Sequence, residues 1–167
     1  FAHRSGVADA EALVDNPGGL MYDHAAATVV RPSAEGDIEL VYDLGEQNCG
    51  YYQFDLVAEE GLVLDLFGVE YITPAGRVQH TERYRNGMRY ICKEGVNRFT
   101  SLMRRSQRYL FITLRNQTRP VEIRNLRLVE STYPVEEVGS FACSDVRLSS
   151  IWEISARTLK LCMEDSY

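Results

Sequence analysis

The sequence predicts an antiparallel β-sandwich of jelly-roll type that is followed by a single C-terminal α-helix. Three observations lead to this fold class. Short segments of alternating apolar and polar residues follow one another between residues 37 and 129, with turn residues between them. No helical pattern of useful length interrupts these segments, which argues against a parallel sheet joined by helices. A helical apolar stripe begins only after residue 144.

Composition sets the broad class of protein. The chain has 167 residues, of which 45% are hydrophobic and 25% are charged, as in ordinary globular proteins. Collagen-like, low-complexity and disordered classes are therefore excluded, and the length suits one domain, or one domain with part of another. No apolar run reaches the roughly 18 residues that a membrane-spanning helix needs, so we expect no membrane as a partner.

Residues 1–36 are expected to form an approach segment that precedes the sandwich. Residues 8–14 have the pattern of a short helix, which the sequence Asn16-Pro17-Gly18-Gly19 would end. Val29 and Val30 are β-branched and are expected to begin a strand.

The predicted sandwich occupies residues 37–134. We expect a turn at Gly45 between its first two strands and another at Glu59-Glu60-Gly61. In the last strand Val121 and Ile123 have one phase and Leu126 and Leu128 the other, which indicates a β-bulge near Asn125. The expected strands are 38–44, 50–57, 62–71, 88–92, 98–103, 109–114 and 121–129.

Residues 135–167 are interpreted as a linker and a helix. Ser144 or Asp145 can cap a helix that runs to about Glu164. One face of this helix carries an apolar stripe that must pack against something. We expect it to contact the sandwich, a catalytic domain that is absent here, or a second copy in a homodimer. The stripe residues are Leu148, Ile151, Trp152 and Leu159.

Charge is distributed unevenly along the chain. The net charge is −6, yet residues 77–127 hold twelve Arg and one Lys against three Glu, a local balance of +10. This segment either binds a polyanion or pairs with the acidic residues of the same chain; we favour internal pairing and do not expect nucleic acid as a partner. Within it, Arg104, Arg105 and Arg108 are candidates for a sugar or interdomain contact.

The cysteines and histidines do not form a metal site. Cys49, Cys92, Cys143 and Cys162 lack metal-ligand spacing, and His3, His24 and His80 are scattered. We therefore expect no metal and no cofactor. The cysteines lie in apolar surroundings and are expected to be four buried thiols, which favours a reducing, cytoplasmic location.

Several short motifs stand in a fixed order along the chain. They are Asp43-Leu44-Gly45-Glu46 with Gly50-Tyr51, Glu70 with Gly76-Arg77-Val78, Arg104-Arg105 with Arg108-Tyr109-Leu110, and, at the junction, Tyr133-Pro134-Val135-Glu136, Gly139-Ser140-Phe141 and Cys143-Ser144-Asp145, followed by Leu148, Ile151-Trp152-Glu153 and Thr158-Leu159. Together they resemble motifs of bacterial α-L-rhamnosidases, a family of glycoside hydrolases, and the resemblance covers roughly residues 38–167. It implies a concanavalin-like sandwich that leads into the first helix of a catalytic (α/α)₆ barrel.

The resemblance further implies a parent enzyme that removes terminal α-L-rhamnose from glycosides with inversion. The family's catalytic acids have no counterpart before Tyr167, so no catalytic residue is expected in this chain, and it should be inactive alone. Asp43, Glu46, Asp55, Asp65 and Glu70 are better explained as solvated or Arg-paired strand carboxylates than as the two facing carboxyls that hydrolysis needs. The expected partners are the catalytic barrel and a rhamnose-containing glycan.

Sugar binding by the sandwich itself is a second hypothesis. Tyr51 is opposite in phase to Tyr52, so its ring is a candidate for an exposed sugar platform. The alternative function is a stand-alone carbohydrate-binding module for an acidic or a rhamnose-containing glycan. If the ligand is acidic, its affinity should fall steeply as the salt concentration rises.

Overall fold

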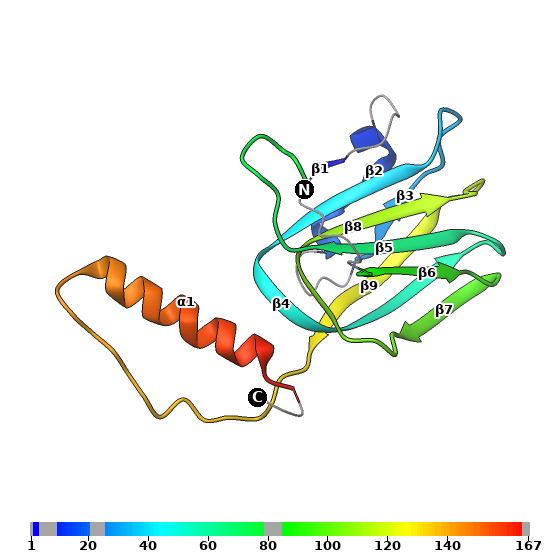
Figure 1. The fold of residues 1–167 in the computed structure, drawn as a ribbon. Helices are drawn as coiled ribbons and strands as arrows, with labels where there is room; N and C mark the ends of the chain where they lie inside the picture. Colours follow the sequence, from blue (N-terminus) through cyan, green and yellow to red (C-terminus); the bar gives the residue numbers. More distant parts are fainter. Residues whose placement is uncertain (1, 4–9, 21–25, 79–84, 165–167) are drawn as a thin grey trace. The chain divides into compact units, whose positions relative to one another are not determined.

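The structure is a computed structural model that describes residues 2–3, 10–20, 26–78 and 85–164. It separates into two compact units, residues 1–129 and residues 130–167, which are described one by one. The first unit consists of antiparallel strands and the second holds one α-helix (Figure 1), so the predicted fold class is confirmed. None of the helices among the described residues is both long and apolar enough to cross a membrane.

The strands of the first unit pair antiparallel in the order β2-β3-β9-β4-β8-β5-β6, and β1 and β7 also pair with β4. Two short 3₁₀ helices, η1 (Ala10–Leu13) and η2 (Pro17–Leu20), precede β3. The strands are β1 (Ala2–His3), β2 (Val14–Asp15), β3 (Thr28–Val30), β4 (Ile38–Ala58), β5 (Val63–Val69), β6 (Gly87–Ile91), β7 (Gly95–Thr100), β8 (Arg105–Arg115) and β9 (Val121–Glu130).

Strand β4 corrects the expectation of two strands separated by a turn at Gly45. It is a single strand of 21 residues. Its pairing with β8 shifts between Asp43 and Asn48 and then continues in the same direction. Gly45 has a φ of 83°, and its amide donates to Asp43 Oδ1 at 2.8 Å. The positive φ therefore produces an irregularity within the strand, and the chain does not reverse.

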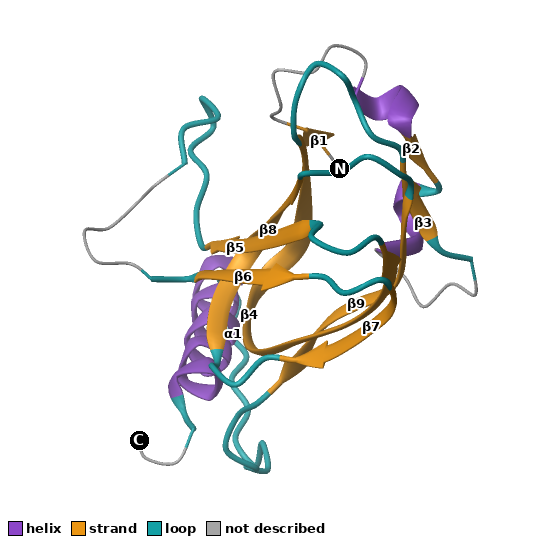
Figure 2. Cartoon of the chain, turned by 90° about the vertical axis from the view of Figure 1, so that its right-hand side faces the viewer, coloured by secondary structure: helices purple, strands orange, loops and turns teal. Residues whose placement is uncertain are grey.

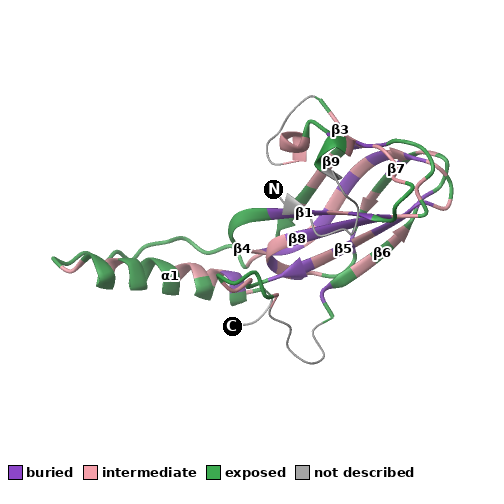
Figure 3. Ribbon diagram, turned by 90° about the horizontal axis from the view of Figure 1, so that it is seen from above, coloured by how far each residue is buried: buried purple, intermediate pink, exposed green. Residues whose placement is uncertain are grey.

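The two halves of β4 belong to different layers of the sandwich. Its first half pairs with β1 and β8, and residues 53–58 pair with β7. Figure 2 shows β5, β6 and β8 in one layer and β7 and β9 in the other, with β4 curving between them. One core cluster fills the space between the layers, and it includes Leu40, Phe54, Leu64, Ile112 and Ile123. Buried positions are concentrated in the central strands (Figure 3).

The N-terminal segment contributes strands to the sandwich. β2 pairs with β3, and β3 pairs with β9, so that Thr28 and Val30 are fully buried. A short helix is expected over residues 8–14. In the described residues of this range, the 3₁₀ helix η1 ends at Leu13, and Val14 is already the first residue of β2. Val14 lies opposite Val30 in the sheet, a pairing that β-branched residues favour.

The last strand changes phase as its sequence predicts. Val121 and Ile123 are buried in the core cluster, and Leu126 and Leu128 also pack against that cluster. Because side chains alternate between the faces of a strand, both pairs can face inward only if the alternation shifts by one residue between them.

The turn after β4 is attached to the turn between β8 and β9 through Glu59. Its carboxylate accepts hydrogen bonds from the backbone and side chain of Thr118 and from the backbone of Arg119. The Thr118 side-chain hydrogen bond is the largest cause that lowers the pKa of Glu59, to about 2. Its side chain is 10% exposed, so these bonds are largely protected from water.

We expect Glu59→Gln to lower the Tm of the sandwich at pH 7 by about 5 °C, because the amide nitrogen would face groups that are themselves donors. The pKa of Glu59 is lower in the folded state, so its contribution is present above the unfolded pKa and is lost as pH falls from about 4.5 towards 2. The Tm values of the variant and the wild type should therefore converge as the pH is lowered from 7 to 2.

Glu94→Gln is the control, since the exposed Glu94 binds the same Arg119. A constant difference at all pH values would contradict this account.

The second unit consists of a linker and helix α1 (Val146–Cys162). Asp145 caps the helix by accepting from the backbone of Arg147 at 3.0 Å. The linker runs back along the helix, as Tyr133 N donates to Met163 O at 3.1 Å and Lys160 Nζ lies 3.3 Å from Glu130 Oε1. An apolar groove of about 290 Å³ separates the two and is lined in part by Val138 and Trp152.

The expectation of four buried thiols is wrong for two of the cysteines. All four are free, and Cys49 and Cys92 are buried in the first unit, but Cys143 and Cys162 are exposed. The difference follows from their place in the chain, since Cys143 belongs to the extended linker and Cys162 is the last residue of α1.

Candidate functional site

A cleft on the outer face of the β4-β8-β5-β6 layer is the main candidate site. Over residues 38–43, 63–67, 87–91 and 109–115 of these strands, the even-numbered residues face the core and the odd-numbered ones face outward. Strand register places Glu39 of β4 opposite Thr113 of β8, Thr113 opposite Asp65 of β5, and Asp65 opposite Arg89 of β6. The floor of this outer cleft is therefore a polar row that crosses four strands.

An apolar row lies beside the polar one. Val41 is opposite Phe111, Phe111 is opposite Phe67, and Phe67 is opposite Gly87. The two phenyl rings meet edge to face, with centroids 6.5 Å apart. Both rings, with Val78 and Arg115, line the outer cleft, which has a volume of about 640 Å³. This volume is in the range of small-molecule binding sites.

Asp65 is the centre of the ionic network in the outer cleft. Its Oδ1 accepts from Arg89 Nε at 2.7 Å, and its Oδ2 accepts from Arg89 Nη2 at 2.8 Å and from Arg115 Nε at 2.9 Å. Arg115 also binds Asp37. The hydrogen bond from Arg89 is the largest cause that lowers the pKa of Asp65. Nearby, the Thr113 hydroxyl donates to Glu39 Oε2 at 3.2 Å.

The arginine-rich segment is paired with the acidic residues of the same chain to a large extent. In the described part of residues 77–127, six arginines form ion pairs with carboxylates, and the acidic partners include Asp37, Asp43, Asp55 and Asp65, which precede the segment. The six are Arg89, Arg98, Arg108, Arg115, Arg119 and Arg124. Internal pairing, the interpretation favoured from the sequence, is confirmed for these residues.

The structure does not bring the four predicted contact residues together in the outer cleft. Arg108 binds Asp43 through two hydrogen bonds of 2.9 and 3.0 Å and lies over the Tyr109 ring. Arg105 is 8% exposed, and its guanidinium binds backbone carbonyls. Arg104 lies just before β8 and is half-buried, as is Tyr51 in β4.

The helix residues that were predicted to pack against a partner are exposed. Leu148, Ile151 and Leu159 are exposed, and Trp152 is 37% exposed. Trp152 and Leu159 line the groove between the linker and α1, whereas Leu148 and Ile151 do not. The partner of this stripe stays a prediction.

Two carboxylates of the sandwich, Asp43 and Asp65, are poorly suited to acid catalysis. A glycosidase needs one carboxyl with a raised pKa that can donate a proton to the leaving group. The guanidinium of Arg108 lowers the pKa of Asp43, and that of Arg89 lowers the pKa of Asp65. Both groups therefore stay ionised at neutral pH and act as acceptors.

The described residues contain no group of three or more His, Cys, Asp or Glu placed to hold a metal ion; His24 and His80 lie outside them.

Residues 33–129, more than half of the chain, match the family described as the bacterial alpha-L-rhamnosidase concanavalin-like domain. The chain belongs to this family. A GH78 family rhamnosidase of Bacillus sp. GL1 is 46% identical, with a TM-score of 0.79, over 83% of this chain and 14% of that one. No curated protein sequence matches significantly.

A rhamnosidase from Klebsiella oxytoca, solved with rhamnose bound, has a TM-score of 0.65 over 75% of this chain and 27% of that one. Its identity is 17%, so the likeness concerns the fold alone. The chain thus spans about a seventh of the Bacillus rhamnosidase and about a quarter of the Klebsiella one. The family assignment made from the sequence motifs is confirmed, and in both of these relatives the matching region is one part of a much longer chain.

Sequence reasoning missed most of the outer cleft. Asp65 was considered as a carboxylate, but Glu39, Thr113, Arg89 and Arg115 were not selected. A signal was present, because Glu39, Asp65 and Thr113 are polar residues at outward positions of strands whose inward positions are apolar. What the sequence could not supply was the order of the strands, which places these three residues in one row.

Proposed function

We propose that this chain is the non-catalytic sandwich module of a glycoside hydrolase that removes terminal α-L-rhamnose from glycosides. The observation that carries the proposal is the family match over residues 33–129, together with 46% identity to a GH78 family rhamnosidase. The proposed reaction is a single displacement with inversion. A general acid protonates the leaving oxygen, and a general base activates water on the opposite face of the sugar.

The chemistry of the sandwich supports assigning catalysis to another part of the parent protein. Asp43 and Asp65 are held ionised by arginine, as described above, and neither can serve as the acid. We place the catalytic acid and base beyond Tyr167, in a barrel of which α1 is the first helix. The exposed residues Leu148, Ile151 and Leu159 would then pack against further barrel helices.

Hydrolysis of 4-nitrophenyl α-L-rhamnopyranoside tests this proposal. The purified 167-residue chain should release no nitrophenol, and the product of the complete gene should release it, with β-L-rhamnose as the first anomer seen by NMR. Activity of the 167-residue chain would show that the sandwich is catalytic. An inactive complete product, or α-L-rhamnose as the first anomer, would contradict the proposed substrate or the inverting mechanism, respectively.

A further inference from the structure

The ionic network of the outer cleft leaves hydrogen-bonding capacity unused. Arg89 uses Nε and Nη2 on Asp65, and Arg115 uses Nε and Nη1 on Asp65 and Asp37. Arg89 Nη1 and Arg115 Nη2 therefore have no partner among the described residues, and neither does Glu39 Oε1. Two donor groups and one acceptor thus belong to side chains that line the same cleft.

These polar groups are held in place before any ligand arrives. Asp65, whose side chain is 20% exposed, fixes two guanidinium groups at once, and Asp37 fixes one of them from the other side. Long side chains normally lose rotamer freedom when they bind a ligand, which weakens binding. Here that loss has largely occurred on folding, so a ligand would meet an ordered set of donors.

The wall beside the polar row is apolar. Phe67, Phe111 and Val78 line it, and Gly87 has no side chain next to the Phe67 ring. A polar row beside an apolar row suits a flat molecule that has hydroxyl groups along one edge and C–H groups on its faces. A pyranose has this distribution of polar and apolar surface.

The charges of the outer cleft favour a neutral ligand. Two carboxylates, Glu39 and Asp65, and two guanidinium groups, Arg89 and Arg115, line the cleft, and Asp37 adds a further carboxylate beside Arg115, so the site has no excess of positive charge. A polyanion would meet the repulsion of both carboxylates and would have to compete with them for arginines that are already paired. The acidic glycan considered from the sequence is therefore disfavoured at this site.

We propose that the outer cleft is a binding subsite for a neutral pyranose of the glycan on which the parent enzyme acts. This inference rests on the proposed function for the identity of the glycan. The hydroxyl groups of the sugar would accept from Arg89 and Arg115 and donate to Glu39, and its C–H face would contact the apolar wall.

Titration of the 167-residue chain with methyl α-L-rhamnopyranoside, followed by ¹H–¹⁵N NMR, tests the proposal. We expect saturable shifts at the amides of residues 39, 65, 89 and 113. Arg89→Met should weaken binding about tenfold, since it removes charged hydrogen-bond donors but keeps the apolar stem. Arg98→Met is the matched control, because Arg98 forms an exposed ion pair with Asp55 and does not line the cleft. Its affinity should equal that of the wild type.

Three results would overturn the proposal. The first is the absence of saturable shifts with this rhamnoside and with methyl β-D-glucopyranoside, in a chain whose spectrum shows it to be folded. The second is equal weakening by both Met variants. The third is tighter binding of an oligogalacturonate with a steep salt dependence, which would assign the cleft to an acidic glycan. Because binding is measured without hydrolysis, its failure is distinguishable from an inactive parent enzyme.

Discussion

Replacing Gly68 with alanine will destabilise the sandwich by about 3 kcal/mol, because β5 has no room for a methyl group at this position. A Cβ here would lie 2.4 Å from Asn86 Nδ2 and 2.7 Å from Gln107 Oε1. Asn86 is buried, and its Nδ2 donates to Gly68 O at 3.0 Å and to Ser106 O at 2.6 Å. Displacing the amide would break both of these hydrogen bonds.

Gly87→Ala provides the matched control for Gly68→Ala. A Cβ on Gly87 would have Phe67 Cδ2 as its nearest contact, at 3.5 Å, which is an ordinary van der Waals distance. Urea unfolding of the two variants should therefore give a much lower midpoint for Gly68→Ala and almost no change for Gly87→Ala. Equal midpoints would show that the Asn86 amide rearranges at little energetic cost.

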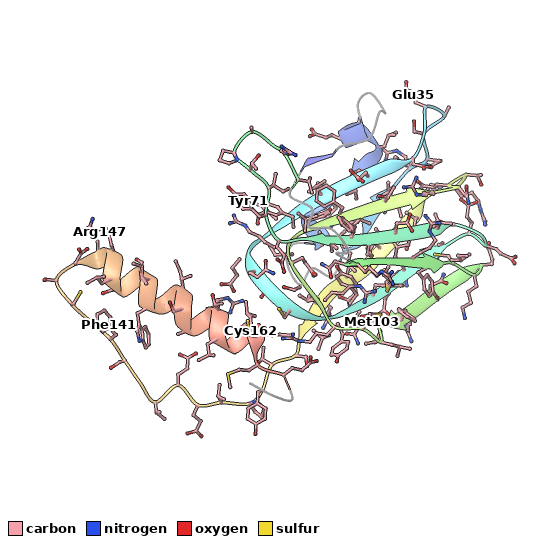
Figure 4. All side chains as sticks on the ribbon, viewed as in Figure 1. Glu35, Tyr71, Met103, Phe141, Arg147 and Cys162 are labelled. Atoms are coloured by element: carbon pink, nitrogen blue, oxygen red, sulfur yellow. The ribbon has the colours of Figure 1, made fainter. Side chains whose placement is uncertain are left out.

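Replacing Arg105 with alanine should also cost about 3 kcal/mol of folding free energy. The Arg105 guanidinium donates from Nη1 to Met103 O at 2.9 Å and from Nη2 to Gly87 O at 3.0 Å, and it lies 5.7 Å from the centre of the Tyr52 ring. It thereby joins β6 to the loop before β8, where Met103 is exposed (Figure 4). Alanine would remove both hydrogen bonds, leaving Met103 O with only the Ser101 hydroxyl as a side-chain donor, and would open a void beside Tyr52.

Arg98→Ala is the comparison for Arg105→Ala, since it removes an arginine whose side chain is 78% exposed. Exposed ion pairs contribute little, so its thermal unfolding should resemble that of the wild type. If Arg105→Ala is equally harmless in the 167-residue chain, its guanidinium has no structural role in the sandwich. An interdomain role in the parent protein would then be the better explanation of this residue.

The fold class was predictable because the alternation of apolar residues is strong in β4, β5 and β8. Leu64, Leu66, Leu110 and Ile112 occupy every second position, and all four are buried. The phase change in β9 was readable for the same reason. The continuity of β4 was not, because Gly45 is compatible with a turn and with an irregular strand. The choice depends on whether β8 continues to pair on both sides of it.

The candidate site was harder to predict than the fold. Arg108 was selected from the sequence, and the structure pairs it with Asp43, 65 residues earlier in the chain. Which carboxylate meets which arginine depends on strand order. β5 pairs on one side with β6, the next strand in the chain, and on the other side with β8, which comes much later. Asp65 and Arg115 meet only because of that order. A pattern confined to single strands contains no such information.

The path of β4 through both layers has a consequence for the synthesis of the chain. Its partners β7, β8 and β9 all come later in the sequence, at residues 95–100, 105–115 and 121–130. Until residue 115 has left the ribosome β4 lacks β8, and until residue 130 it still lacks β9, so it has an unpaired edge throughout this interval. Such edges are open to association with other chains, and pairing between distant segments is slow. We therefore expect nascent chains that end before β9 to be the species most prone to aggregation and most dependent on chaperones.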